Sequence, residues 1–148
     1  MRIFNLGKKS RNQISWHSLL SEVQRGATHA SSPLHGDKHW RAVAAAGIEI
    51  AGNNFEQRAA ALAFGMIHDC QRLNDDWDPE HGLRAASWAS KSQQLAGLIG
   101  KEGRALVSQA CLDHEKGFTS KDETIGLYWD ADRINLWRVG VSPDRRSS

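Results

Sequence analysis

The pattern of apolar and polar positions along the 148-residue chain predicts helices throughout. Apolar residues recur at steps of three and four, the spacing that places side chains on one face of a helix. No stretch alternates between apolar and polar positions for long enough to indicate a strand. The expected helices cover about residues 15–25, 37–51, 55–73, 79–97, 102–115 and 123–136. We therefore expect an all-α fold, a single compact bundle of about five to seven helices.

Capping residues mark several ends of these helices. Ser15, Asp37 and Asn54 each precede an apolar-periodic segment and are candidate N-caps, because their side-chain oxygens can accept the free amides of the first turn. Pro79 suits the first turn of the fourth helix. The polar and basic residues 1–14 are expected to form an N-terminal arm, and residues 15–148 a single domain.

Composition and charge narrow the kinds of partner. Apolar residues make up 40% and charged residues 24%, and the formal net charge is +2 with scattered positive positions. Without a basic stripe, extended nucleic acid is not an expected partner, whereas a small anionic ligand needs only a few local cations. No apolar run is long enough to span a bilayer, so no membrane association is expected.

The cysteines and tryptophans add two weaker expectations. Cys70 and Cys111 fall in helical segments without Cys-x-x-Cys spacing, which indicates free thiols and a cytoplasmic location. Six tryptophans leave apolar area that a second copy of the chain could cover, so a homodimer is one option.

Four polar side chains interrupt the apolar faces of three expected helices. They are His39 on the second helix, His68 and Asp69 on the third, and Asp132 on the sixth. An inward histidine by itself is more often a hydrogen-bonded core residue than a ligand. A buried carboxylate beside an imidazole is harder to accommodate, because both polar groups need partners on an apolar face. A divalent cation between these side chains would neutralise the carboxylates and order the imidazoles.

Two imidazoles and two carboxylates form a nitrogen–oxygen donor set that suits transition metals. The sequence therefore predicts a site for Mn, Fe, Co, Ni or Zn with His39, His68, Asp69 and Asp132 as ligands. A metal that prefers six donors would keep positions for water and substrate, and the pKa of a bound water falls far below that of bulk water.

Three segments resemble the HD superfamily of metal-dependent phosphohydrolases: HGDKHWRAV, MIHDC and DADRI. The family pattern is a helix-borne His, a His-Asp pair and a distant Asp, and the resemblance gives these roles to the four ligands above. His35 and Asp130 are the alternatives for the first and the last ligand. DPEHGLRAA and LDHEKG resemble the later His elements of small HD proteins, so that the resemblance spans about residues 33–141.

The resemblance implies hydrolysis of a phosphate ester or anhydride of a nucleotide or similar small molecule, with a metal-bound water as nucleophile. Arg72, one turn beyond His68, is the candidate phosphate contact and a candidate catalytic residue. Glu80 is a candidate for orienting water. Further candidates for substrate contacts are His35, Arg84 and Arg133.

His81 and His114 leave two versions of the site open. They either face the substrate as proton donors near neutral pH or complete a second metal position, as in dinuclear members of the family. We expect the first version, because further ligands are not evident beside His68. The chain departs from the family where Cys70, Gln71 and Arg72 replace the familiar small residue and lysine, which puts the usual catalytic lysine in doubt.

Two other functions are compatible with this sequence. A minority of HD proteins use a two-iron site for oxidation, and that function would require His81 and His114 as ligands. The third alternative is a module that binds metal or nucleotide for sensing and turns nothing over. A pure scaffold need not bury four polar groups, which argues against this last alternative.

Overall fold

The computed structural model describes residues 13–116, 120 and 122–138. Within these residues the chain forms six α-helices and no strand, which confirms the all-α prediction. The helices are α1 (Trp16–Gly26), α2 (Asp37–Ala51), α3 (Phe55–Ile67), α4 (His81–Lys91), α5 (Gln93–Asp113) and α6 (Glu123–Arg138). Of the expected N-terminal arm, residues 1–12 lie outside the described part, as do residues 139–148 of the expected domain.

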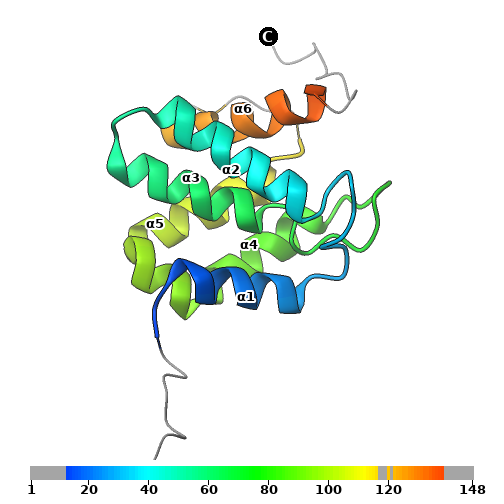
Figure 1. Cartoon of the computed structure of the whole chain (residues 1–148), viewed down its shortest axis with the longest axis horizontal. Helices are drawn as coiled ribbons and strands as arrows, with labels where there is room; N and C mark the ends of the chain where they lie inside the picture. Colours follow the sequence, from blue (N-terminus) through cyan, green and yellow to red (C-terminus); the bar gives the residue numbers. More distant parts are fainter. Residues whose placement is uncertain (1–12, 117–119, 121, 139–148) are drawn as a thin grey trace, which may run out of the picture.

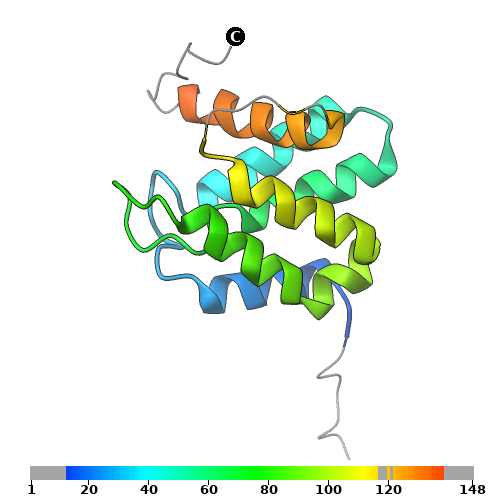
Figure 2. The same cartoon turned by 180° about the vertical axis from the view of Figure 1, so that it is seen from behind.

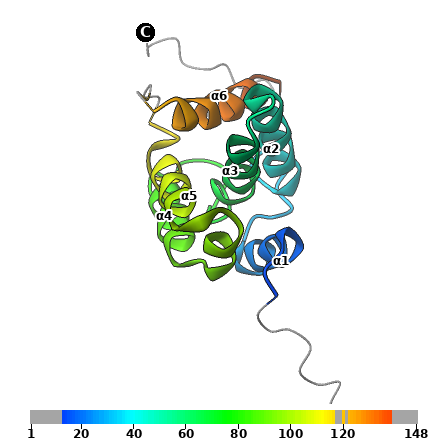
Figure 3. The same ribbon diagram turned by 90° about the vertical axis from the view of Figure 1, so that its left-hand side faces the viewer.

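Two helical hairpins form the centre of the fold. α2 packs along α3, α4 packs along α5, and contacts between α3 and α5 join the two hairpins. α6 lies across α2 at one end of the molecule, and α1 covers the opposite end (Figure 1). The view from behind brings α4 and α5 to the front (Figure 2). Figure 3 shows the two hairpins as neighbouring layers between α6 and α1.

Two of the three predicted N-caps are confirmed. The Ser15 side chain accepts the amide of Ser18 at the start of α1, and the Asn54 side chain accepts the amide of Gln57 at the start of α3. The third prediction is wrong by one residue, because Asp37 is the first helical residue of α2 and Gly36 occupies the cap position. Its carboxylate instead forms an ion pair with Arg41 one turn later.

The breaks between the later helices differ from the prediction. α3 ends at Ile67 and not near residue 73, because tighter hydrogen bonds from Cys70 to Ile67 and from Arg72 to Asp69 replace the α-helical ones. Pro79 precedes α4, which begins at His81. The next break comes at Ser92, whose side chain caps α5, while Gly100, with φ of 79°, only kinks α5.

Two glycines allow the helices of each hairpin to approach closely. A Cβ atom on Gly65 of α3 would lie 2.6 Å from the backbone nitrogen of Ala44 on α2. A Cβ atom on Gly82 of α4 would lie 2.6 Å from the carbonyl oxygen of Cys111 on α5. Both contacts lie within one turn of a histidine, so the absent side chains help to bring imidazoles from paired helices together.

The core is built from aromatic and small aliphatic side chains. Trp40, Phe64 and Tyr128 are its largest fully buried members, and Phe64 stacks on Tyr128 with ring centres 5.2 Å apart. Phe64 also stacks on the ring of His68 at 4.9 Å, which connects the apolar core to the polar residues described next. No described helix combines the length and the apolar character needed to cross a bilayer.

Candidate metal centre

The ends of four helices meet inside the molecule and each carries an imidazole. His39 lies in the first turn of α2, His68 at the C-cap of α3, His81 at the start of α4 and His114 at the C-cap of α5. All four are buried, as are the carboxylates of Asp69 and Asp132. The structure thus brings together the four predicted ligands and both histidines whose role the sequence left open.

His39 and His68 form the first imidazole pair. Their Nε2 atoms lie 3.1 Å apart. The Oδ1 atom of Asp132 lies 3.1 Å from Nε2 of His39 and 3.4 Å from Nε2 of His68. This oxygen is buried and accepts no hydrogen bond of good geometry. Three ligand atoms from α2, α3 and α6 therefore converge on one point.

His81 and His114 form the second imidazole pair. Their Nε2 atoms lie 3.0 Å apart. The Oδ1 atom of Asp69 lies 3.1 Å from Nε2 of His81 and 3.2 Å from Nε2 of His114. This second group of ligand atoms comes from α4, α5 and the turn after α3.

The Asp69 carboxylate lies between the two pairs. Its Oδ1 atom faces the second pair, while its Oδ2 atom lies 3.4 Å from Nε2 of His39 and 3.5 Å from Nε2 of His68. His35 also approaches Oδ2, with its Nδ1 atom at 3.1 Å. A single carboxylate therefore touches both groups, and His35, the sequence-based alternative ligand, lies at the edge of the first group.

Backbone carbonyls fix the tautomers of three of these imidazoles. A carbonyl oxygen can only accept, so a ring Nδ1 within hydrogen-bond distance of one carries its proton and the neutral ring presents a lone pair at Nε2. The acceptors are the carbonyls of Phe64 and Gly65 for His68, of Cys111 for His114 and of Asp78 for His81, at 2.6–3.1 Å. Lone pairs that face each other across 3 Å repel, and a proton or a cation between them removes the repulsion.

In the metal-free protein, one imidazole of each pair holds such a proton. Burial alone would lower the pKa of His39, but the carboxylates of Asp132 and Asp69, at 3.1 Å and 3.4 Å from Nε2, outweigh burial and raise the pKa to about 9. The same balance, with Asp69 as the main partner, raises the pKa of His114 to about 9. Burial alone would raise the pKa of Asp69, but the surrounding imidazoles lower it well below its usual value. Each pair therefore contains an imidazole whose protonated form is stabilised by a neighbouring carboxylate.

Buried His and Asp groups in this cluster could hold a metal ion. Three sets of ligand atoms each lie within 4.8 Å of one another: His35, His39 and Asp69; His39, His68 and Asp132; and His68, Asp69 and His114. The donors are imidazole nitrogens and carboxylate oxygens, the set that suits Mn, Fe, Co, Ni and Zn. The converging lone pairs and the buried Asp132 oxygen without a good donor fit such an ion.

Arg72, the predicted phosphate contact, lies against the second pair. Its Nη1 atom is 3.0 Å from Nδ1 and 3.1 Å from Nε2 of His81. Nε and Nη2 donate to the carbonyls of Asn74 and Asp76, which fixes the guanidinium, and the side chain is buried. A fixed positive charge therefore lies next to the second group of ligand atoms.

The other predicted contacts are Glu80, Arg84 and Arg133. Glu80 is exposed and precedes α4. Arg84 donates to both carboxylate oxygens of Asp78. Arg133 forms an ion pair with Asp130, whose side chain is 64% exposed, so this alternative to Asp132 lies on the outer face of α6.

Two residues near His81 were missed by the sequence analysis. Glu115 places Oε2 3.1 Å from Nδ1 of His81, and its position directly after His114 could have indicated it. Asp78 accepts the same Nδ1 through its carbonyl, and nothing in the acidic segment distinguishes it from Asp75 or Asp76.

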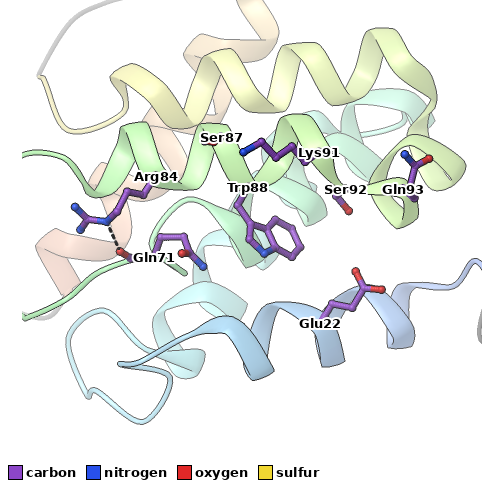
Figure 4. A pocket seen from close by; sticks show the side chains of 8 residues that line it. All are labelled: Glu22, Gln71, Arg84, Ser87, Trp88, Lys91, Ser92 and Gln93. Carbon is purple, nitrogen blue, oxygen red and sulfur yellow. Dashed lines mark hydrogen bonds between the residues drawn. The ribbon is translucent and has the colours of Figure 1, made fainter.

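A cavity of about 600 Å³ lies beside this region, between α1 and α4. Arg84, Trp88 and Lys91 line it from one face of α4, with Glu22 of α1 opposite (Figure 4). Neither imidazole pair lines it. The cavity is therefore distinct from the metal-ligand cluster, although Arg84 borders it.

Comparison with known proteins adds no relative of this chain. No family model, no curated protein and no solved structure matches it. The interpretation of the cluster therefore depends on its own geometry and chemistry.

Proposed function

We propose that the chain is a metal-dependent phosphohydrolase with two cation positions that share Asp69. The observation that carries this proposal is the arrangement of the two imidazole pairs on either side of that carboxylate. His39, His68 and Asp132 would hold the first cation, and His81 and His114 the second. The proposed substrate is a phosphate ester or anhydride of a nucleotide or similar small molecule.

The geometry supports a ligand role for His81 and His114 over the proton-donor role that the sequence favours. The Nδ1 proton of each ring is bound to a carbonyl, so each ring, once it is neutral, presents the Nε2 lone pair that a metal ligand needs. Both Nε2 atoms point at the same oxygen of Asp69. Imidazoles held in this way are typical of metal ligands.

The chain's own residues supply what phosphoryl transfer needs besides the cations. When bound, the cations would activate a water molecule and polarise a phosphoryl oxygen. The buried guanidinium of Arg72 would compensate negative charge on the phosphate, because it lies against His81 at the second position. The resemblance of the His, His-Asp and Asp segments to the HD superfamily supports the same reaction class.

The test is phosphate release by the metal-loaded protein. The chelated protein would be reloaded with Mn, Fe, Co, Ni or Zn and assayed on a chromogenic phosphate ester and a panel of nucleotides. Asp132→Asn should abolish release, whereas Asp130→Asn, two positions away on the exposed side of α6, should leave it unchanged. If neither the wild type nor Asp130→Asn releases phosphate while both cations are bound, the hydrolase proposal is wrong and a metal-binding sensor module describes the chain better.

A two-iron oxygenase is the second candidate, and one observation favours it. That function requires His81 and His114 as ligands, and both lie at the Asp69 carboxylate. Oxygen uptake by the iron-loaded protein in the presence of an organic substrate, without phosphate release, would select this alternative. Phosphate release under anaerobic conditions with a redox-inert metal such as Zn would exclude it.

A further inference from the structure

The second cation position depends on a loop, whereas the first is built almost wholly on helices. His68 and His114 donate from Nδ1 to carbonyls of their own helices. His81 donates instead to the carbonyl of Asp78, which belongs to the segment between α3 and α4. The Asp78 carbonyl is the nearest of three partners of this Nδ1 atom, at 2.6 Å against 3.0 Å for Arg72 and 3.1 Å for Glu115, so the orientation of the imidazole depends on the position of Asp78.

Asp78 is fixed by three hydrogen bonds to its buried carboxylate. The Nη2 atom of Arg84 donates to Oδ1 at 2.7 Å and to Oδ2 at 2.6 Å. The amide of Leu73, near the middle of the same segment, donates to Oδ2 at 2.8 Å. The Asp78 carboxylate thus ties the middle of the segment to α4, and the Asp78 carbonyl holds the imidazole of His81 where the segment ends.

Arg84 extends this connection back to the end of α3. Its Nε atom donates to the carbonyl of Gln71 at 3.0 Å, the bond drawn at the edge of the cavity in Figure 4. Gln71 follows Asp69 by two residues, so the guanidinium joins the turn that carries the shared carboxylate to the helix that carries His81. The Arg84 side chain is half-buried and its partner Asp78 is buried, which makes this ion pair stronger than an exposed one.

We propose that Asp78 and Arg84 are positioning residues for the second cation position, so that breaking their ion pair weakens this position and leaves the first intact. This inference rests on the proposed two-cation function. Neither side chain touches the cation positions, and both act through the orientation of His81. Residues that orient metal-ligating imidazoles typically change metal affinity by about 10–100-fold when they are substituted.

The test is a stepwise metal titration of the chelated protein, with Zn²⁺ or Co²⁺ alone as the probe. Calorimetry would yield a dissociation constant for each position in the wild type, in Asp78→Asn and in Arg84→Gln. Each variant should bind the first cation as the wild type does and the second about 10–100-fold more weakly. The double variant should be no weaker than either single one, because both substitutions break the same pair.

A matched control is available near the first position. Asp37 and Arg41 form a pair on α2 beside His39, with a longer N–O distance of 3.1 Å and with Arg41 67% exposed. Asp37→Asn should leave both dissociation constants unchanged. Arg84→Lys, which keeps the charge but cannot reach Asp78 and the Gln71 carbonyl together, is the milder variant should the others fail to fold, and should weaken the second position alone.

Each result decides between the claims. If Asp78→Asn and Arg84→Gln both keep the two wild-type dissociation constants, the positioning role is wrong. If affinity falls equally at both positions, the ion pair contributes only to the stability of the fold, and the positioning role is also wrong. A wild type that binds one cation would overturn the two-cation proposal itself, and the positioning role with it.

Discussion

Gly82 offers a direct test of how helix packing sets the proposed metal centre. A Cβ atom at this position would lie 2.6 Å from the carbonyl oxygen of Cys111 and 3.1 Å from that of Leu112. Ordinary contacts begin near 3.4 Å, and the obstructing atoms are backbone. Gly82→Ala must therefore move α4 and α5 apart by about 0.8 Å, the difference between these two distances.

That movement acts on both imidazoles of the second pair. His81 precedes Gly82, and the Cys111 carbonyl is the acceptor that orients His114. Metal–ligand distances tolerate deviations of about 0.2 Å, so we expect the second cation to bind at least about ten-fold more weakly. Overpacking of this kind should also lower the free energy of unfolding by about 1–3 kcal/mol.

The assay is the two-step metal titration, together with urea unfolding of the metal-free protein. Gly65→Ala is the reciprocal variant, because its Cβ would meet Ala44 and separate α2 from α3 beside the first pair. Gly126→Ala is the control, since its nearest obstructing atom lies 3.9 Å away, and it should stabilise α6 by about 0.5–1 kcal/mol. Our reasoning is refuted if Gly82→Ala keeps both wild-type constants, or if it and Gly65→Ala weaken the same position.

Three further predictions follow from the same cluster. Because the pKa values of His39 and His114 are raised to about 9, both are protonated at pH 7. Metal binding must displace these protons, so calorimetry in buffers of different ionisation enthalpy should detect about two protons released per chain. For the same reason, metal affinity should rise as the pH approaches 9. The raised pKa values of His39 and His114 stabilise the metal-free fold fully below about pH 6.5, and this stabilisation is lost above about pH 9. In urea unfolding of the metal-free protein, the free energy of unfolding should therefore fall between these two pH values. Asp69→Asn should weaken both cations by at least about 100-fold while far-UV circular dichroism stays helical; tight binding at either position would contradict its shared role.

The sequence could indicate the four candidate ligands because each combines a polar side chain with an apolar surrounding. His68 and Asp69 follow a helix whose preceding turns are almost wholly buried, and Asp132 lies on the same face as Ile125 and Trp129. This contrast is local and can be read from the helical period. It also separates Asp132 from the exposed Asp130, two residues earlier.

The relation between the two imidazole pairs could not be read in the same way. It depends on the break of α3 at Ile67, which turns Asp69 toward α4 and α5, and the helical pattern continues past that point to Leu73. Leu73 is in fact 58% exposed. It also depends on the close approach at Gly82, where a missing side chain gives no signal in a pattern of apolar residues.

The positioning residues are harder still to predict. Three aspartates, Asp75, Asp76 and Asp78, precede Pro79, and only the fold shows which of them is buried against Arg84. Long-range hydrogen bonds of this kind depend on the path of a loop, for which the sequence carries turn signals but no contact information.

The most direct test of the two-cation centre is the number of divalent cations bound per chain. The chelated protein would be dialysed to equilibrium against Zn²⁺, Mn²⁺ or Co²⁺, and the metal and protein contents measured by elemental and amino-acid analysis. We expect two tightly bound cations per chain in the wild type and none in Asp69→Asn. A wild type that retains fewer than two, or an Asp69→Asn protein that retains as many as the wild type, would contradict the shared-carboxylate centre.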